Sequence, residues 1–402
     1  MGALEGVPAP ATWRFDRARR TATPPLERAR VKYVSRADVT FEWDEIFGRA
    51  CYADPARTRA DDRGRPRAVI DVGANVGFAS AYFAREVTGE RGRVIALEPI
   101  PETFEALRCN AAALCGAPGS DDAVWAAPGT SEDDDGGWTR GGVLGDVRAA
   151  HVGGGGVGSG CGAIYAHDVG AGSTGGGTLE FTSFPRAAGW STLTEHRNDA
   201  ETVRNLIEYV FDALKPSTSS SSSERFDGLE PNVVTSFGRA VRALVLDDDD
   251  DDTKDVNPLR KLVSHVAAFA LTVAVRCVAA YMLSGARRVS RPVVSVSDVI
   301  DAHGLDVVDV LKIDVERAEL DVLRGVSDAH WPRFRSVVCE CHDVDGSLDA
   351  VLRLLRAHFA DVTVTPLFGR AALFIVRASN AIAIARARPP SSPSPPRETP
   401  RA

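Results

Sequence analysis

The sequence is short of the features that mark several large classes of protein. Its formal net charge at pH 7 is −8, so it lacks the basic surplus that binding to phosphate backbones requires, and we expect no nucleic-acid partner. The seven cysteines form no zinc-binding spacing, and their odd number without a secretory signal favours free thiols. We therefore expect a cytoplasmic protein, with organellar targeting left open by the Arg-rich N-terminus.

Long uninterrupted hydrophobic runs are also scarce. The best candidate lies between Leu262 and Leu283 and is long enough to cross a bilayer, but it contains His265 and Arg276, which are costly in lipid. Its Ala, Leu and Val residues recur at helical spacing. We therefore interpret it as a helix packed on the domain, with a membrane span as the weaker alternative.

Composition divides the chain into ordered parts and low-complexity inserts. Segments rich in Gly, Ser and Asp cannot bury enough apolar surface to offset the entropy lost on ordering. The predicted segments are a flexible N-terminal extension (1–35), the first half of the domain (36–127), a disordered Gly/Asp-rich insert (128–177), a strand and lid segment (178–213), a disordered Ser/Asp-rich insert (214–257), the second half of the domain (258–378) and a Pro/Ser/Arg-rich tail (379–402).

Strand-like and helical patterns alternate in the ordered parts. Short apolar runs occupy residues 68–73, 94–99, 123–128, 307–314 and 335–343, and helical patterns follow most of them. This alternation predicts a Rossmann-like, doubly wound α/β fold, in which helices cover both faces of a mostly parallel sheet. Two final runs flank Phe368 and Gly369 and predict an antiparallel C-terminal hairpin.

The sharpest local signal is D-V-G-A-N-V-G at residues 71–77, between a predicted strand and a predicted helix. Its glycines allow a tight turn and close approach of a ligand to the backbone, and the helix start offers free N–H groups. The pattern is not G-x-G-x-x-G, because Asn75 stands where a pyrophosphate needs glycine. A cofactor with an amine and a carboxylate, such as S-adenosyl-L-methionine, fits better.

A carboxylate at the end of the next predicted strand completes this prediction. Glu98 follows Asp71 by 27 residues, and an acid there can accept hydrogen bonds from both hydroxyls of a ribose. Asp71 has two open roles, as a ligand of the methionyl amine or as an anchor of the turn. The predicted cofactor-binding residues are Asp71, Gly73, Ala74, Asn75, Gly77, Glu98 and Pro99.

These motifs resemble the FkbM-type methyltransferase family. Residues 69–80 and 96–110 are similar to its first two motifs, and L-K-I-D-V-E-R-A-E within 309–325 is close to its L-K-I-D-V-E-G-A-E motif. Further similar segments lie at 41–52, 179–193 and 337–343. The resemblance implies a fold of the class I methyltransferase type, S-adenosyl-L-methionine as cofactor and, usually, methylation of an oxygen.

Arg317 departs from the family pattern, which has glycine after the Val-Glu pair. Glycine suits a helix start that needs an unusual dihedral angle or a close approach of the ligand. An arginine there predicts ordinary helical geometry or a charged group that reaches toward the substrate.

Candidates for the chemistry lie at the carboxyl ends of the later strands, where ligands of open α/β sheets bind. Methyl transfer to an alcohol requires its alignment and the removal of its proton. Asp314 is the first candidate for a base or a substrate contact. Glu316 is the next, or it is a first-turn carboxylate that suits the helix dipole. His342 has the ordinary pKa of a base near neutrality, or it closes its strand.

Two further residues complete the predicted catalytic set. Lys312 shares a strand face with Asp314, and for a buried lysine we predict Glu340 on the neighbouring strand as the partner. This pair either braces the sheet or takes part in catalysis. Asp314, Glu340 and His342 are ligand types that suit a hard divalent ion, but their spacing demands none, and we predict no metal site.

The leading hypothesis is an O-methyltransferase that acts on a small molecule or a sugar hydroxyl. The alternatives are a catalytically inactive binding protein with the same fold and a nicotinamide-dependent oxidoreductase. Residues 178–197 are predicted to form a strand and a lid over the site, with Trp190, Ser191 and Thr192 at its tip. The other interpretation of this segment is a strand that pairs with residues 289–296 and an ordinary turn.

Overall fold

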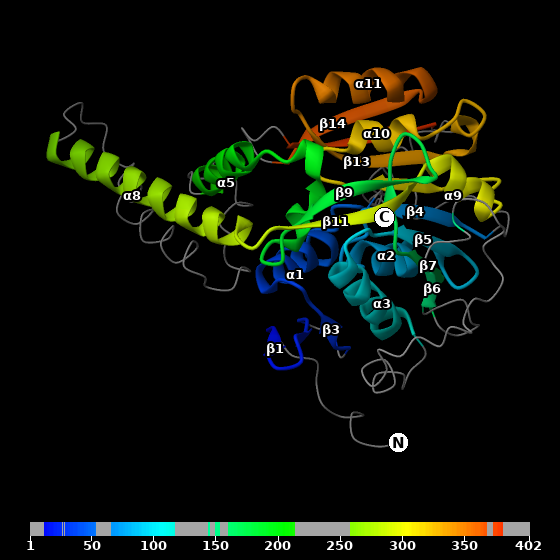
Figure 1. Cartoon of the computed structure of the whole chain (residues 1–402), viewed down its shortest axis with the longest axis horizontal. Coiled ribbons are helices and arrows are strands. Elements are labelled where there is room, and N and C mark those ends of the chain that lie inside the picture. The colour runs from blue at the N-terminus through cyan, green and yellow to red at the C-terminus, as the bar shows by residue number, and fades with distance from the viewer. Residues whose placement is uncertain are drawn as a thin grey trace, which may run out of the picture.

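The structure is a computed structural model that describes residues 12–25, 27, 29–53, 66–116, 144, 149–152, 160–213, 258–367 and 373–380. Its centre is an eight-stranded sheet (Figure 1). In spatial order the strands are β14 (Asp361–Pro366), β15 (Leu373–Ser379), β13 (Ser336–His342), β12 (Val310–Ile313), β4 (Ala68–Val72), β5 (Arg93–Leu97), β7 (Ala163–His167) and β6 (Ala149–Val152).

Most of this sheet is parallel, as the alternation of patterns predicts. Strands β13, β12, β4, β5 and β7 run parallel to their neighbours in this series. Strand β15 is antiparallel to both β13 and β14, which confirms the predicted hairpin, and β6 is antiparallel to β7. The predicted strand at 123–128 lies outside the described residues.

Helices cover both faces of the sheet, because successive side chains of a strand point to opposite faces. In β4, Ala68, Ile70 and Val72 pack in one core with α9 (Val296–Ala302), α10 (Glu319–Arg324) and α11 (Ser347–His358). Val69 packs in a second core with α1 (Arg36–Trp43), α2 (Phe78–Tyr82) and α3 (Pro101–Cys115). Figure 1 shows these two helical layers on either side of the strands. Single turns of π-helix, Asp44–Gly48 and Phe83–Thr88, extend α1 and α2.

A second sheet lies beside the carboxyl edge of the first. It has four strands in the order β10 (Thr192–Leu193), β9 (Gly177–Ser183), β11 (Arg287–Val294) and β8 (Gly170–Ala171). Strand β9 pairs with β11 antiparallel along its whole length. The predicted island therefore does form a strand, and its partner is the 289–296 segment named as the alternative to a free lid.

The prediction of a disordered insert at 128–177 is wrong for its described part, because β6, β7 and β8 lie within it. The reason is that two of its glycines serve close packing. A Cβ atom at Gly162 would meet the hydroxyl of Thr88 at 2.2 Å, and one at Gly170 would meet the ring of Phe181 at 2.5 Å. Glycine content therefore reflects tight contacts at these positions. The predicted insert at 214–257 lies outside the described residues.

The N-terminal extension is also more ordered than predicted. Strands β1 (Arg14–Asp16), β2 (Thr21–Thr23) and β3 (Val31–Lys32) form a small antiparallel sheet. Ala22 and Val31 are buried in the same core as α1 and α2. Aromatic side chains join the two parts, because the ring of Trp13 stacks on Phe15 and meets Trp43 edge to face. The tail beyond residue 380 lies outside the described residues.

The segment considered as a membrane span forms α8 (Pro258–Leu283), which packs against α5 (Asp199–Ala213) and extends away from the sheets in Figure 1. Leu271, Val275 and Ala279 are buried, whereas Phe269 is 72% exposed on the opposite side of the helix. Helix α8 is therefore docked along one side only. Among the described residues, no helix is both long and apolar enough to span a membrane.

Candidate functional site

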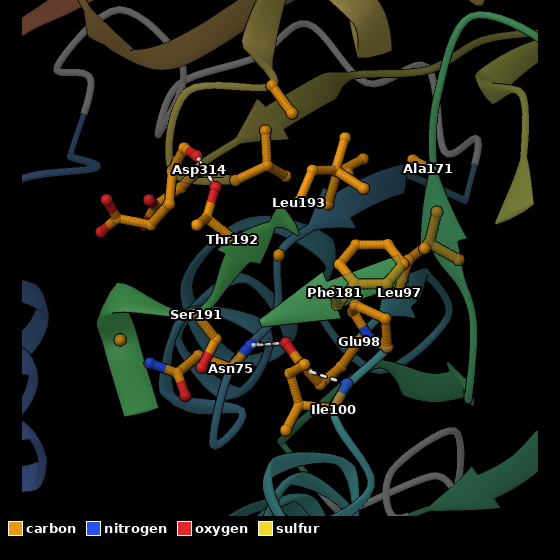
Figure 2. A pocket seen from close by; sticks show the side chains of 18 of the residues that line it. Asn75, Leu97, Glu98, Ile100, Ala171, Phe181, Ser191, Thr192, Leu193 and Asp314 are labelled. Atoms are coloured by element: carbon orange, nitrogen blue, oxygen red, sulfur yellow. Dashed lines mark hydrogen bonds between the residues drawn. The ribbon is translucent and has the colours of Figure 1, made fainter. Parts of the chain in front are cut away.

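The candidate site is a pocket at the carboxyl ends of β4, β5 and β12, roofed by β9, β10 and the turn before β10 (Figure 2). In Figure 2 an apolar group, with Leu97, Ala171 and Phe181, lies on one side, and Asn75, Ser191 and Asp314 lie on the other. Six of the predicted cofactor-binding and catalytic residues line this pocket: Gly73, Asn75, Glu98, Pro99, Asp314 and Glu316.

The turn after β4 has the tight geometry that its glycines predict. Gly73 has φ +73° and Gly77 has φ +90°, and Asn75 also lies in the left-handed region with φ +48°. The N–H groups of Gly73 and Ala74 donate to the carbonyl of Leu97, which ties the turn to the end of β5. A Cβ atom at Gly73 would lie 1.8 Å from the carbonyl oxygen of Asp314, so only glycine lets the turn approach β12 this closely.

Glu98 lies against this turn from the end of β5. Its carboxylate accepts hydrogen bonds from the N–H of Asn75 at 3.0 Å and from the N–H of Ile100 at 2.8 Å (Figure 2). Burial raises the pKa of Glu98 to about 7, although the two N–H donors favour the charged form. The turn and Glu98 therefore converge on one pocket, and Glu98 is held rigidly at its wall.

Asp71 lies in β4 and holds the turn that follows this strand in place. Its side chain is fully buried, accepts a hydrogen bond from the hydroxyl of Ser80 at 2.6 Å and lies 3.1 Å from the Nζ atom of Lys312. Asp71, Ala74 and Gly77 do not line the pocket described above. Of the two roles left open for Asp71, the geometry favours the anchor. Gly77 packs against α3, because a Cβ atom there would meet Leu107 at 3.2 Å.

The predicted pairing of Lys312 with Glu340 is wrong. In the register of the sheet, Lys312 lies opposite Asp71 on β4 and opposite Val338 on β13, so Glu340 is offset along its strand. The Nζ atom donates to the carbonyl of Gly73 at 2.7 Å. Burial alone lowers the pKa of Lys312, but the charges of Asp71 and Asp314 outweigh it and raise the pKa above its usual value.

Asp314 and Glu316 face the pocket from the turn after β12. The Asp314 carboxylate lies 3.6 Å from the Nζ atom of Lys312, and its side chain is 30% exposed. Burial raises the pKa of Asp314, and Lys312 offsets this only in part. A carboxylate with a raised pKa beside a pocket is a stronger base than an ordinary one.

His342 lies between two carboxylates rather than in the pocket. Its Nδ1 atom is 2.9 Å from Glu319, and its Nε2 atom is 3.2 Å from Glu316. Burial lowers the pKa of His342, but Glu316 and Glu319 raise it well above its ordinary value. The pKa of His342 therefore departs from the ordinary value expected from its residue type, because two neighbouring carboxylates favour the imidazolium form. The ring therefore links the carboxylates of Glu316 and Glu319.

Glu340 is a carboxylate of β13 that does not line the pocket. Burial raises the pKa of Glu340 well above its ordinary value, and the charges of Asp314 and Glu45 add to the effect. Among the residues that the structure describes, no group of three His, Cys, Asp or Glu side chains is arranged to hold a metal ion.

Two carboxylates that the sequence did not single out contact residues that line the pocket. Glu42 of α1 accepts a hydrogen bond from the side-chain amide of Asn75 at 2.5 Å, and Asp38, one turn earlier, accepts from the N–H of Gly189 at 3.4 Å. Burial raises the pKa of Asp38 to about 6 and that of Glu42 well above its ordinary value. Their spacing of four residues, on one face of a helix, was the available signal.

The segment predicted as a lid lies over the pocket and forms a turn and a strand there, not a free loop. Ala188, Gly189 and Ser191 line the pocket together with Thr192 and Leu193 of β10. Trp190 does not line this pocket and lies at a second, smaller one on the other side of Thr192. The segment is tied down by β10, which pairs with β9.

Arg317 does not have the predicted helical geometry, and its guanidinium group lies at the second, smaller pocket. Its φ of +80° is far from helical geometry, and Glu316 before it has φ +52°, so α10 begins only at Glu319. The guanidinium group points toward the start of α5 and does not line the main pocket.

The lining of the pocket fits the parts of S-adenosyl-L-methionine. The carboxylate of Glu98 suits ribose hydroxyls, and the side chains of Leu97, Ile100 and Phe181 offer an apolar surface for an adenine ring. The side-chain oxygen of Asn75 is buried and has no hydrogen-bond partner among the described residues. Such an oxygen needs a donor, and a methionyl amine would provide one.

Comparisons with known proteins identify the family. Methyltransferase sdnD of Sordaria araneosa is 27% identical over 346 residues, which cover 85% of this chain and 91% of that protein. The 31-O-demethyl-FK506 methyltransferase FkbM of Streptomyces tacrolimicus is 58% identical over 66 residues, 16% of this chain and only 25% of that relative. No solved structure matches the chain. The Methyltransferase FkbM domain matches residues 71–207 and 213–360, and the chain therefore belongs to the FkbM methyltransferase family.

Proposed function

We propose that the protein transfers the methyl group of S-adenosyl-L-methionine to a hydroxyl oxygen of a small molecule or a sugar. The observation that carries this proposal is the shared pocket: Glu98 lies on one wall, and Asp314 and Glu316 lie on another. Strand β4 lies between β5 and β12, so the strand order reverses at β4. This order supports a Rossmann-like arrangement, in which a ligand binds at the point of reversal.

The cofactor supplies an electrophilic methyl group on a sulfonium. The chain's own residues then have separate tasks. Glu98 accepts hydrogen bonds from ribose hydroxyls, and the oxygen of Asn75 accepts one from the methionyl amine. Asp314 takes the proton from the acceptor hydroxyl, because its raised pKa and its place at the pocket wall suit a general base. Lys312 and Asp71 hold the turn and β12 in register for these contacts.

The name of the Streptomyces relative supports an oxygen acceptor, since it is a 31-O-demethyl-FK506 methyltransferase. A protein that keeps the fold but does not turn over is the second candidate, and the arginine at position 317 motivates it.

The test is an assay for S-adenosylhomocysteine and methylated product after incubation with S-adenosyl-L-methionine and a panel of small alcohols and sugars. Asp314→Asn should lower kcat by about 10²- to 10⁴-fold, as loss of a general base does. Asp361→Asn, an exposed change at the start of β14, should have no effect. Binding of the cofactor without product on every acceptor would instead favour the inactive protein.

A further inference from the structure

Arg317 combines an unusual backbone conformation with a buried charge. Its φ of +80° lies in the left-handed region, which glycine adopts readily and other residues rarely do. Its side chain is nevertheless only 8% exposed. A buried guanidinium group in a conformation that its residue type disfavours must be held by specific contacts.

The contacts of its guanidinium group come from the segment before α5 and from the first turn of α5. The Nη1 atom of Arg317 donates to the carbonyl of His196 at 3.2 Å and to that of Asn198 at 3.4 Å. The Nη2 atom donates to the hydroxyl of Thr202 at 3.0 Å and lies 3.8 Å from the carboxylate of Glu201, itself 7% exposed. One side chain therefore binds two backbone carbonyls and two side chains of residues 196–202.

The same turn is connected to the pocket wall. The hydroxyl of Thr192 donates to the carbonyl of Glu316, and both residues line the main pocket. The N–H of Arg317 donates to Glu319 at 2.8 Å, and the same carboxylate oxygen lies 2.9 Å from His342. A displacement of Arg317 would therefore also displace Thr192 above the pocket and the carboxylates of Glu316 and Glu319 on either side of His342.

We propose that Arg317 is a positioning residue that fixes the acceptor side of the pocket. It clamps residues 196–202 to the turn at Glu316, beside the direct hydrogen bond from Thr192 to Glu316, so that Thr192 and Glu316 form a wall of fixed shape against which the acceptor hydroxyl is placed. The inference rests on the proposed methyl transfer for its acceptor, but the clamp itself does not. Because the cofactor side of the pocket is built from β4 and β5, the clamp acts on acceptor binding rather than on cofactor binding.

The test uses the full chain with Arg317→Gly and Arg317→Lys. Glycine suits the φ of +80°, so this variant removes the clamp without adding backbone strain. Arg204→Ala is the matched control, because it removes an exposed arginine that lies 3.8 Å from the same Glu201. The measurements are amide hydrogen exchange over residues 194–204, the Kd for S-adenosylhomocysteine, and KM and kcat for each acceptor that the wild type methylates.

We expect Arg317→Gly to speed exchange in 194–204 at least ten-fold and to raise the acceptor KM at least five-fold. The Kd for S-adenosylhomocysteine should stay within two-fold of wild type, Arg317→Lys should recover part of both losses, and Arg204→Ala should match wild type. Unchanged exchange in Arg317→Gly would overturn the clamp. Faster exchange with an unchanged acceptor KM would show that the contact is merely structural. If the wild type methylates no acceptor, the proposed function fails, whereas the exchange result still decides whether the clamp exists.

Discussion

The Nζ atom of Lys312 lies 3.1 Å from the carboxylate of Asp71, and the two residues face each other directly across β12 and β4. Both side chains are buried, with 2% and 0% exposure. The ammonium group also donates to the carbonyl of Gly73, in the turn that lines the pocket. A single buried ion pair thus joins the two strands whose ends carry the candidate cofactor and acceptor contacts.

Removing the cation should therefore destabilise the protein strongly. Lys312→Met leaves Asp71 buried without its partner, and such a loss costs about 3–5 kcal/mol in the free energy of unfolding. Urea unfolding measures it. Lys32→Met is the control, because Lys32 is partly exposed and lies 3.9 Å from Glu105, and we expect it to cost below about 1 kcal/mol. Equal losses in the two variants would contradict the role given to Lys312.

Gly73 and Gly89 offer a matched pair for the turn. Both have positive φ, +73° and +59°, but a Cβ atom at Gly73 would collide with the backbone of Asp314, whereas at Gly89 it would meet nothing within 4 Å. Gly89→Ala should cost about 1–3 kcal/mol from the dihedral angles alone, because φ +59° with ψ 179° is a conformation that essentially only glycine adopts. Gly73→Ala should cost clearly more and weaken cofactor binding, as thermal unfolding and calorimetry can show. Similar losses at the two positions would mean that the close approach is unimportant.

The buried pair of His167 and His303 should make the fold sensitive to acid. Their Nε2 atoms are 2.9 Å apart, and burial lowers the pKa of His167 to about 3 and that of His303 to about 4. Because these folded-state values lie below the ordinary 6.5, the unfolded chain binds more protons at acid pH. The stability is fully present above pH 6.5 and is lost as the pH falls toward about 4.

Urea unfolding at several pH values tests this sensitivity. The free energy of unfolding of the wild type should fall between pH 7 and pH 4 by at least about 1–2 kcal/mol, since one pKa unit corresponds to about 1.4 kcal/mol. His167→Asn should flatten this dependence. His151→Asn, an exposed change, should leave it intact. The same slope in His167→Asn and wild type would rule out the pair as its source.

The contribution of His342 to stability should depend on pH in the opposite direction to that of His167 and His303. The carboxylates of Glu316 and Glu319 raise its pKa, so its stabilising contribution is present below its ordinary pKa and is lost only as the pH rises through the raised value. We expect the ring to titrate well above its ordinary pKa, which histidine NMR can follow through the ring nitrogen shifts. A titration midpoint near 6.5 would restore His342 as a candidate general base.

Much of the sheet could be predicted from local patterns. The run around Leu311 and the one around Cys339 are apolar on both faces, as strands covered by two helical layers must be, and both form parallel strands. Glu98 was predictable for the same reason, since it follows directly on such a run. The partner of Lys312 could not be predicted, because the sequence does not reveal which strand lies on each side of β12.

Long-range contacts explain the other errors. The glycines near Ala163 suggest disorder by composition, yet Gly162 is required by the close approach of Thr88, far away in the sequence. Arg317 suggests helical geometry by residue type, yet its contacts with α5 hold it in the left-handed region. In both cases a distant partner, invisible in a local window, determines the local conformation.

The most direct test of cofactor binding in the pocket beside Glu98 is isothermal titration of the protein with S-adenosylhomocysteine and, separately, with NADH. We expect S-adenosylhomocysteine to bind and NADH not to bind, and we expect Glu98→Gln to weaken the binding of S-adenosylhomocysteine at least ten-fold. Glu102→Gln, an exposed change close by in the chain, should leave the affinity unchanged. Equal affinity of Glu98→Gln and wild type for S-adenosylhomocysteine, or binding of NADH in its place, would contradict the proposal that Glu98 holds an S-adenosyl cofactor.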